Sequence, residues 1–283
     1  MALREILLRW TGVGQELEEL GLSRDNFSGL YDLSLLLTGI DSTRRTFFFS
    51  SYEFLRTLDD LVDLGDPREA IPILEGSLQN MSLNSEQLLP TGSAQVDASI
   101  ERIYSYKEVI PNFEVYLPQI AKLINLVKED ATRAIERKLM NTPELKERAA
   151  SLLFPAYQIL LYTLGGGEFN SSEQFRELCF YHNSYAHMID YKKDLASHLP
   201  QVPQELLAEQ GITNFEEIET DYPMAVRRDF INSSIKGIAQ NIFAMFDTNL
   251  PFMFKVGLLG YMVMRPIKYE LKKYVNEKYM RRD

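Results

Sequence analysis

The chain contains little cysteine and histidine, which removes several common site chemistries. Its single cysteine among 283 residues, Cys179, cannot form an intrachain disulfide, so a reducing compartment such as the cytoplasm is expected. The three histidines (His182, His187 and His198) have no Cys or Glu partner at zinc-site spacing. Cys179 has no evident base partner and is expected in the core.

Basic runs and long apolar runs are also missing. The net charge is −10 and no Lys/Arg run exceeds a pair, which argues against nucleic acid as a partner. No run reaches about 18 apolar residues, so no membrane-spanning helix is expected. The nearest, residues 250–264, favours a buried core helix, with peripheral membrane association as the alternative. The charged first residues are not expected to form a signal peptide.

Alternating β-branched patterns are nearly absent, and apolar residues instead recur with helical spacing, as in Ile120, Leu123, Ile124 and Val127. Pro, Gly and polar clusters predict breaks at residues 65–67, 88–93, 142–143, 165–172 and 199–203. Helix starts are expected at residues 142–144 and 170–173, each with a capping residue before an acidic first turn. Together these patterns predict one all-α domain over residues 1–283, built as a bundle with a central cavity.

Two Asp-x-x-x-Asp pairs are the most informative local pattern. Asp59 and Asp63 form the first, and Asp190 and Asp194 form the second. At this spacing two carboxylates lie on one helix face and repel by roughly 0.2–0.5 kcal/mol, a cost that a hard divalent cation would offset. Asp60 is expected to be solvated or paired with Arg56.

On facing helices of a bundle, the two pairs would converge on one cavity. Tyr52 and Arg56 precede Asp59 on the same helix, and aromatic residues are frequent on both helices, although the run 47–49 is expected to be plain core. Carboxylates at the mouth of an apolar cavity suit Mg²⁺-assisted departure of a diphosphate from an allylic carbon, with walls that shield the carbocation.

These residues resemble the squalene/phytoene synthase family. The first family motif, a Tyr, then an Arg, then Asp-x-x-x-Asp, is matched by Tyr52, Arg56, Asp59 and Asp63. Residues 187–194 (HMIDYKKD) are similar to the second aspartate motif, and a Leu-Pro at 199–200 and a stretch ending in Gly211 follow as in the family. The resemblance extends from about residue 30 to 280.

The resemblance implies an isoprenoid-synthase-type bundle and head-to-head condensation of two prenyl diphosphates, farnesyl or geranylgeranyl. It implies Mg²⁺ at one diphosphate on the first aspartate pair and Mg²⁺ at the other diphosphate on the second pair. Tyr52 and Arg56 would contact diphosphate or support the first motif. The resemblance also implies late diphosphate contacts from Tyr261 and from Lys278 or Arg281. The need for NADPH and the oligomeric state stay open.

Three features depart from the family. The second motif usually reads Asn-x-x-Arg-Asp-x-x-Glu-Asp, whereas Ala186, Ile189 and Lys193 stand at the Asn, Arg and Glu positions here. The early Ser-x-Ser-Phe motif is missing. The helix after residue 150 carries Leu153 and Ala156 where small glycines are expected, so the prenyl channel should be shorter or reshaped.

Lys193 separates the functional alternatives. If the Lys193 side chain turns away from the cavity, the family reaction is credible. If it pairs with an aspartate inside the cavity, that reaction is in question. The enzymatic alternatives are a terpene cyclase and a prenyl diphosphatase. The non-catalytic alternative is a binding or assembly protein, which the altered second motif favours, whereas the unchanged first motif favours an enzyme.

Overall fold

The computed structural model describes residues 41–82, 88–218, 221–252, 254–259 and 262, together with the backbone but not the side chains of residues 189 and 190. All regular structure within these residues is helical, which confirms the all-α prediction. The α-helices are α4 (Ser42–Asp63), α5 (Pro67–Ser82), α6 (Ala94–Tyr104), α7 (Leu117–Glu136), α8 (Thr142–Thr163), α9 (Glu173–Ala196), α10 (Gln204–Ala208) and α11 (Met224–Asn241). Three short 3-10 helices are η2 (Phe113–Val115), η3 (Phe215–Ile218) and η4 (Ile242–Asp247).

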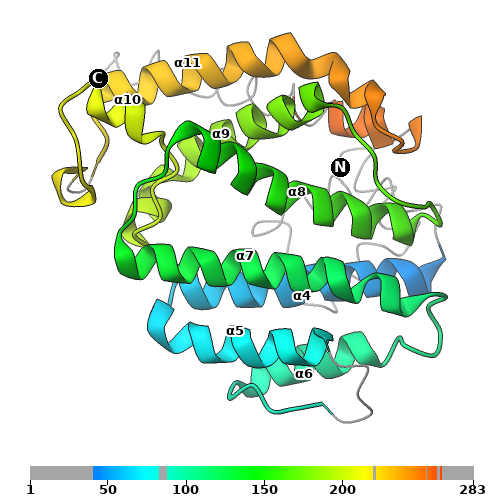
Figure 1. Ribbon diagram of the computed structural model, residues 1–283. Coiled ribbons are helices and arrows are strands. Elements are labelled where there is room, and N and C mark those ends of the chain that lie inside the picture. The colour runs from blue at the N-terminus through cyan, green and yellow to red at the C-terminus, as the bar shows by residue number, and fades with distance from the viewer. Residues whose placement is uncertain (1–40, 83–87, 219–220, 253, 260–261, 263–283) are drawn as a thin grey trace, which may run out of the picture.

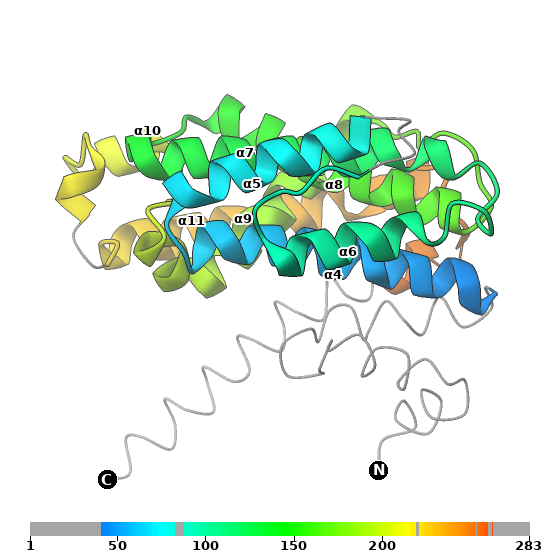
Figure 2. The ribbon, with the colours of Figure 1, turned by 90° about the horizontal axis from the view of Figure 1, so that it is seen from below.

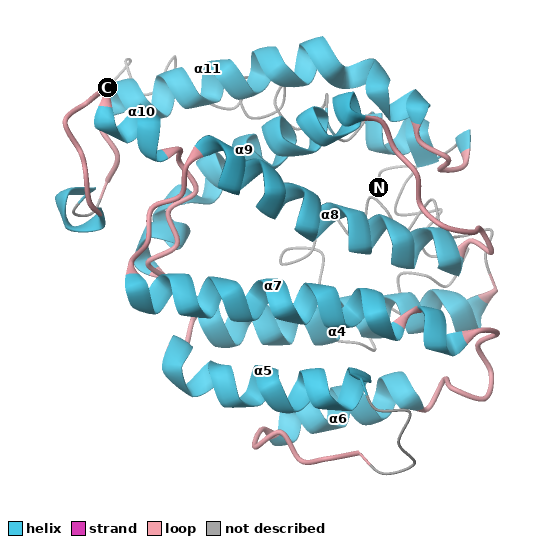
Figure 3. Ribbon diagram, in the orientation of Figure 1, coloured by secondary structure: helices cyan, strands magenta, loops and turns pink. Residues whose placement is uncertain are grey.

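The helices lie alongside one another, with α4 and α7 in the middle of the molecule (Figure 1). Helices α5 and α6 lie on one side of this central pair, and α8, α9 and α11 lie on the other (Figures 1 and 3). The view from below shows the same helices arranged in two layers, with α5 and α7 above α6 and α4 (Figure 2). Direct packing of α5 on α7, α7 on α8 and α8 on α9 places α4, α7, α8 and α9 around a common interior.

The predicted breaks coincide with helix ends. Helix α4 ends at Asp63 and α5 begins at Pro67, as the Gly-Asp-Pro sequence between them indicates. Helix α8 begins at the expected place, but its cap is Asn141, which forms a reciprocal capping box with Glu144. After α8, Gly165 adopts φ +78°, a left-handed conformation that ends the helix and suits glycine.

The aromatic residues of α4 form the centre of the core. Phe47, Phe49 and Phe54 are fully buried, and the Phe47 ring packs edge-on against Tyr116 at a centroid distance of 4.8 Å. This confirms the interpretation of the run 47–49 as core. Cys179 is also buried in this cluster, as expected. This buried packing anchors α4 in the core, and the same helix carries Asp59 and Asp63.

The apolar stretch near the C-terminal end lies partly in the core. Leu250, Phe254, Leu258 and Met262 are buried, whereas Phe252 is 66% exposed. The four-residue spacing of the buried positions supports the expected core packing of one helical face. Among the helices that the structure describes, none combines the length and the apolar character required to cross a membrane.

Candidate functional site

The interior between α4, α7, α8 and α9 contains a cavity of about 460 Å³. Asp59 and Asp63 line it from α4, and Asp194 lines it from α9, so the first aspartate pair and one member of the second pair border the same cavity. Tyr52 and Arg56, which were predicted to support this site, line the same cavity. The side chain of Asp190 lies outside the described residues, as do Tyr261, Lys278 and Arg281.

Two of the three α4 aspartates bind the same arginine. Arg56 Nη1 donates to Asp59 Oδ2 at 2.6 Å, and Arg56 Nη2 donates to Asp60 Oδ1 at 2.6 Å. The Asp60 pairing is the one expected from the sequence. Carboxylate oxygens of Asp59, Asp60 and Asp63 lie within 4.8 Å of one another, a cluster of the oxygen ligands that Mg²⁺ prefers. Arg56 thus offsets part of the repulsion between Asp59 and Asp63 that the sequence pattern implied.

The surroundings of Asp59 shift the pKa of its carboxylate. Burial, followed by the charge of Asp63, raises the pKa of Asp59 to about 6, and Arg56 opposes this rise. The side chain nevertheless keeps 40% of its surface accessible, since it borders the cavity rather than closely packed protein. At neutral pH the carboxylate is therefore mainly ionised, and a cation entering the cavity would stabilise that form.

Lys193 points into the cavity and pairs with the first aspartate motif. Its Nζ lies 2.7 Å from Asp63 Oδ2, so this ion pair joins α9 to the C-terminal end of α4. Ser197, one turn further along α9, donates from its hydroxyl to the backbone carbonyl of Asp63 at 2.8 Å. Of the two orientations considered for Lys193, the structure has the one in which it occupies the site.

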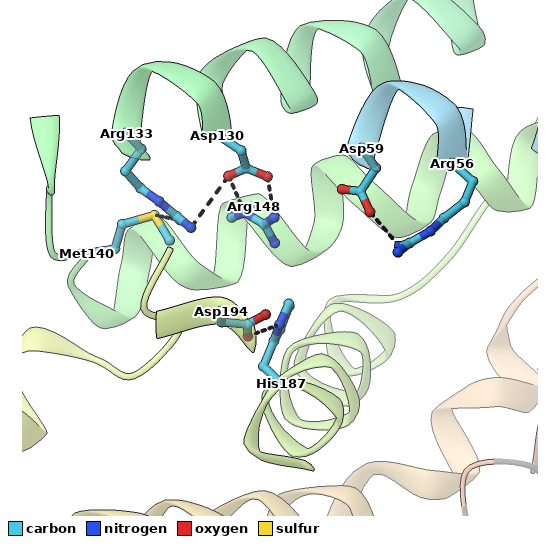
Figure 4. Close-up of polar contacts among 8 residues, drawn as sticks. All are labelled: Arg56, Asp59, Asp130, Arg133, Met140, Arg148, His187 and Asp194. Atoms are coloured by element: carbon cyan, nitrogen blue, oxygen red, sulfur yellow. Dashed lines mark hydrogen bonds and ion pairs between the residues drawn. The ribbon is translucent and has the colours of Figure 1, made fainter. Parts of the chain in front are cut away.

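The second aspartate motif is supported from within α9. His187 Nδ1 lies 2.8 Å from Asp194 Oδ2, and both side chains line the cavity (Figure 4). The histidine lies seven residues before the aspartate, two turns along the same helix face. This contact holds the Asp194 carboxylate in place within the cavity, whose lining also includes Arg148.

A buried charged cluster on α7 and α8 was missed by sequence reasoning. Asp130 is only 7% exposed and accepts two hydrogen bonds from Arg148, one of them from Nε at 3.0 Å (Figure 4). Arg133 Nη2 lies 3.6 Å from Asp130 Oδ1. Burial alone would raise the pKa of Asp130, but Arg148 and then Arg133 outweigh it and hold that pKa below its ordinary value.

A signal for this cluster was present in the sequence. Asp130 and Arg133 continue the apolar spacing of Leu123 and Val127 along α7, so they occupy core-facing positions that charged residues rarely take without partners. Asp130 and Arg148 also line the cavity. Burial lowers the pKa of the Arg133 guanidinium to about 10, against the attraction of Asp130.

The remaining cavity wall is largely apolar. Leu123, Leu126 and Val127 contribute from α7, and Leu152 and Ala156 contribute from α8. The sequence predicted Leu153 and Ala156 at this wall. Ala156 is there, but its neighbour from α8 at the wall is Leu152 rather than Leu153, and both leucines also pack against the hydrophobic core. The cavity therefore combines a charged end with a wall suited to a hydrocarbon chain.

The donor set of the α4 cluster fits a hard divalent cation, because three carboxylates offer oxygen atoms within reach of one another. Each described carboxylate that lines the cavity also has a nitrogen partner: Arg56, Lys193, Arg148 or His187.

No model of a known protein family matches this chain, and no curated protein matches its sequence.

Proposed function

We propose that this protein is a Mg²⁺-dependent enzyme that ionises allylic prenyl diphosphates for head-to-head condensation, as the squalene/phytoene synthase family does. The observation that carries the proposal is that Asp59, Asp63 and Asp194 line one cavity whose other wall is apolar. The resemblance of residues 52–63 and 187–194 to the two family motifs supports the same reaction. The substrates would be farnesyl or geranylgeranyl diphosphate.

Asp59 and Asp63 would hold Mg²⁺ at one diphosphate, and Asp190 and Asp194 would hold it at the other. When bound, the metal supplies positive charge that stabilises the diphosphate leaving group. The allylic C–O bond breaks with both electrons leaving on the diphosphate, and a carbocation remains on the prenyl chain. Attack by the double bond of a second prenyl diphosphate would form the carbon–carbon bond and move the positive charge to that substrate, and loss of a proton would leave a joined intermediate with one diphosphate. Departure of that diphosphate and loss of a second proton would give a phytoene-type product, whereas a squalene-type product would need a hydride from a reductant such as NADPH.

The chain's own groups would assist in two ways. Arg56 and Arg148 keep fixed positive charge at the end of the cavity where the diphosphate would lie. The apolar residues of α7 and α8 would hold the hydrocarbon chain and exclude water, with about 25 cal/mol gained for each Å² of apolar surface buried. A dry wall protects a carbocation from premature capture, which is the condition for carbon–carbon bond formation.

Reaction of a single substrate is the second candidate, and the size of the cavity favours it. A volume of about 460 Å³ suits one ligand, since small-molecule sites span about 300–1,000 Å³. Capture of the carbocation by water would make the protein a prenyl diphosphatase. Capture by a double bond of the same chain would make it a terpene cyclase.

A non-catalytic binding or assembly protein is the third candidate. The ion pair between Lys193 and Asp63 favours it, because the ammonium group occupies a carboxylate that Mg²⁺ would otherwise share. Such a protein would bind the diphosphate ligand and release no product. A titration with Mg²⁺ in the presence of a diphosphate analogue separates this candidate from the enzymes. The enzymes should bind the metal under these conditions, whereas the non-catalytic protein should not.

The test is incubation with labelled farnesyl and geranylgeranyl diphosphate and Mg²⁺, with and without NADPH, followed by product mass analysis. We expect diphosphate release to fall by about a hundredfold or more in Asp59→Ala, the size of loss seen when a charge-stabilising group is removed. Asp229→Ala, at a 49% exposed aspartate of α11, is the matched control and should release diphosphate at the wild-type rate. If the wild type releases diphosphate no faster than Asp59→Ala does, the enzymatic proposal is refuted.

A further inference from the structure

Lys193 is a cation that the chain itself places inside the cavity. Its Nζ bonds with Asp63 at 2.7 Å, and 39% of its side-chain surface stays accessible. An ammonium group has three N–H donors, and the bond to Asp63 uses one of them. Lys193 therefore has donors to offer a ligand in the cavity without leaving the aspartate.

The other two permanent cations of the described lining are more firmly committed. Arg56 bonds with both Asp59 and Asp60, and Arg148 makes two hydrogen bonds to Asp130. Breaking either arrangement would leave partly buried carboxylates uncompensated. Lys193 has a compact, strongly hydrated charge on a flexible stem, so it adjusts to a ligand more readily than these arginines.

The charge of the lining shows what Lys193 contributes. Among the described lining residues, four carboxylates face three permanent cations, which leaves one net negative charge. With a neutral residue in place of Lys193, the same lining would carry two net negative charges before any ion binds. The lysine thus halves the net negative charge that a diphosphate meets in the metal-free cavity, and it places its own positive charge where the diphosphate can reach it.

We propose that the Lys193 ammonium group binds the diphosphate directly, as a cation built into the chain, and gives the site an affinity for diphosphate that does not depend on Mg²⁺. The class of ligand rests on the proposed function. Asp63 can bind Lys193 and a metal ion at the same time, because a carboxylate has two oxygens and Lys193 contacts only Oδ2. One aspartate can therefore anchor Lys193 and still contribute an oxygen to a metal ion.

The experiment measures the binding of inorganic pyrophosphate by calorimetry, first in EDTA and then with Mg²⁺. In EDTA we expect the wild type to bind, and Lys193→Gln to bind about tenfold to a hundredfold more weakly, as for loss of a hydrogen bond to a charged group. Lys193→Arg keeps the charge and should stay near the wild type. Lys192→Gln is the matched control, because the adjacent Lys192 is exposed on the same helix.

With Mg²⁺ present, the deficit of Lys193→Gln should shrink, because the metal supplies charge that the lysine no longer provides. Melting curves of the variants verify that each is folded. Three results would overturn the inference: no binding by the wild type in EDTA, equal binding by Lys193→Gln, or tighter binding by Lys193→Gln. The last would mean that the lysine blocks the site.

This outcome is separable from that of the turnover assay. If Lys193→Gln loses binding in EDTA while no prenyl substrate is turned over, the lysine is a diphosphate ligand in a protein without the proposed activity. If the wild type turns over substrate while Lys193→Gln retains its binding in EDTA, the enzymatic proposal stands and the role of Lys193 is wrong.

Discussion

The buried aspartate between two arginines offers the sharpest test of what holds the site together. Asp130 joins α7 to α8 through two hydrogen bonds with Arg148, and Arg133 lies beside it. The Asp130→Asn substitution keeps the shape of the side chain and removes its charge. Both arginines would then lose their compensating carboxylate, with Arg133 only 6% exposed. Removing one partner of a buried pair costs roughly 3–5 kcal/mol.

An independent sum gives a similar magnitude. Two hydrogen bonds between charged groups contribute about 1.5–3 kcal/mol each, or about 3–6 kcal/mol together. Total stability is typically about 5–15 kcal/mol, so the loss is a large fraction of it. Urea unfolding measures the free energy directly. The melting temperature should fall by roughly 6–20 °C, at about 2–4 °C per kcal/mol for chains of about 150–250 residues, and toward the lower part of that range because this chain has 283 residues.

The pH dependence of this loss follows from the depressed pKa of Asp130. Its contribution to stability is fully present above the unfolded pKa of 3.8 and is lost as the pH falls toward the lower folded pKa. The difference in unfolding free energy between the wild type and Asp130→Asn should therefore be constant above pH 3.8 and should shrink as the pH falls below it.

Two comparisons protect this interpretation. Asp229→Asn removes an exposed partner of Arg228 and should change stability by less than about 1 kcal/mol. In a double-mutant cycle, Arg148→Gln should be less harmful when Asp130 is already Asn, with a coupling of about 0.5–3 kcal/mol. A loss in Asp130→Asn no larger than that of Asp229→Asn would refute the view that this pair fastens α7 to α8.

Two further predictions concern α4 and α8. Without metal, Asp59→Asn should stabilise the protein near pH 7. Folding raises the pKa of Asp59 from 3.8 to about 6, so the ionised carboxylate lowers the unfolding free energy of the protein as the pH increases between those values. With a 40% exposed side chain the gain should be about 1 kcal/mol or less, vanishing below pH 3.8 in urea titrations. Asn141→Ala should lose about 1 kcal/mol with the capping box, whereas Asn141→Asp should not; equal urea midpoints would contradict this.

Local chemistry made the helices predictable. The ends of α4 and α8 follow from Gly, Pro and capping residues, whose effects act within one turn. The convergence of Asp59, Asp63 and Asp194 could also be anticipated, because a bundle with inward-facing carboxylates has few other arrangements. Each of these inferences depends on spacing along one helix and on a general packing rule.

Partner choice was not predictable in the same way. Asp130 could have been noticed as a charge at a core-facing position, but nothing in the sequence identifies Arg148 as its main partner across α7 and α8. Likewise, a lysine at residue 193 is compatible with turning toward the cavity or toward water. The choice depends on how α9 is rotated against α4, which is set by the whole interface rather than by the motif.

The rotation of α9 against α4 brings the first and second aspartate motifs into direct contact. Lys193 and Ser197 both reach Asp63, one at its carboxylate and one at its backbone carbonyl, so α9 fixes the end of α4 that carries the first motif. A substitution at residue 193 therefore changes the charge of the second motif and the support of the first. Because both effects meet at Asp63, the lysine distinguishes this cavity from a site built of two independent aspartate pairs. Whether the proposed reaction is possible then depends on whether Asp63 binds Lys193 and a metal ion together or only one of them.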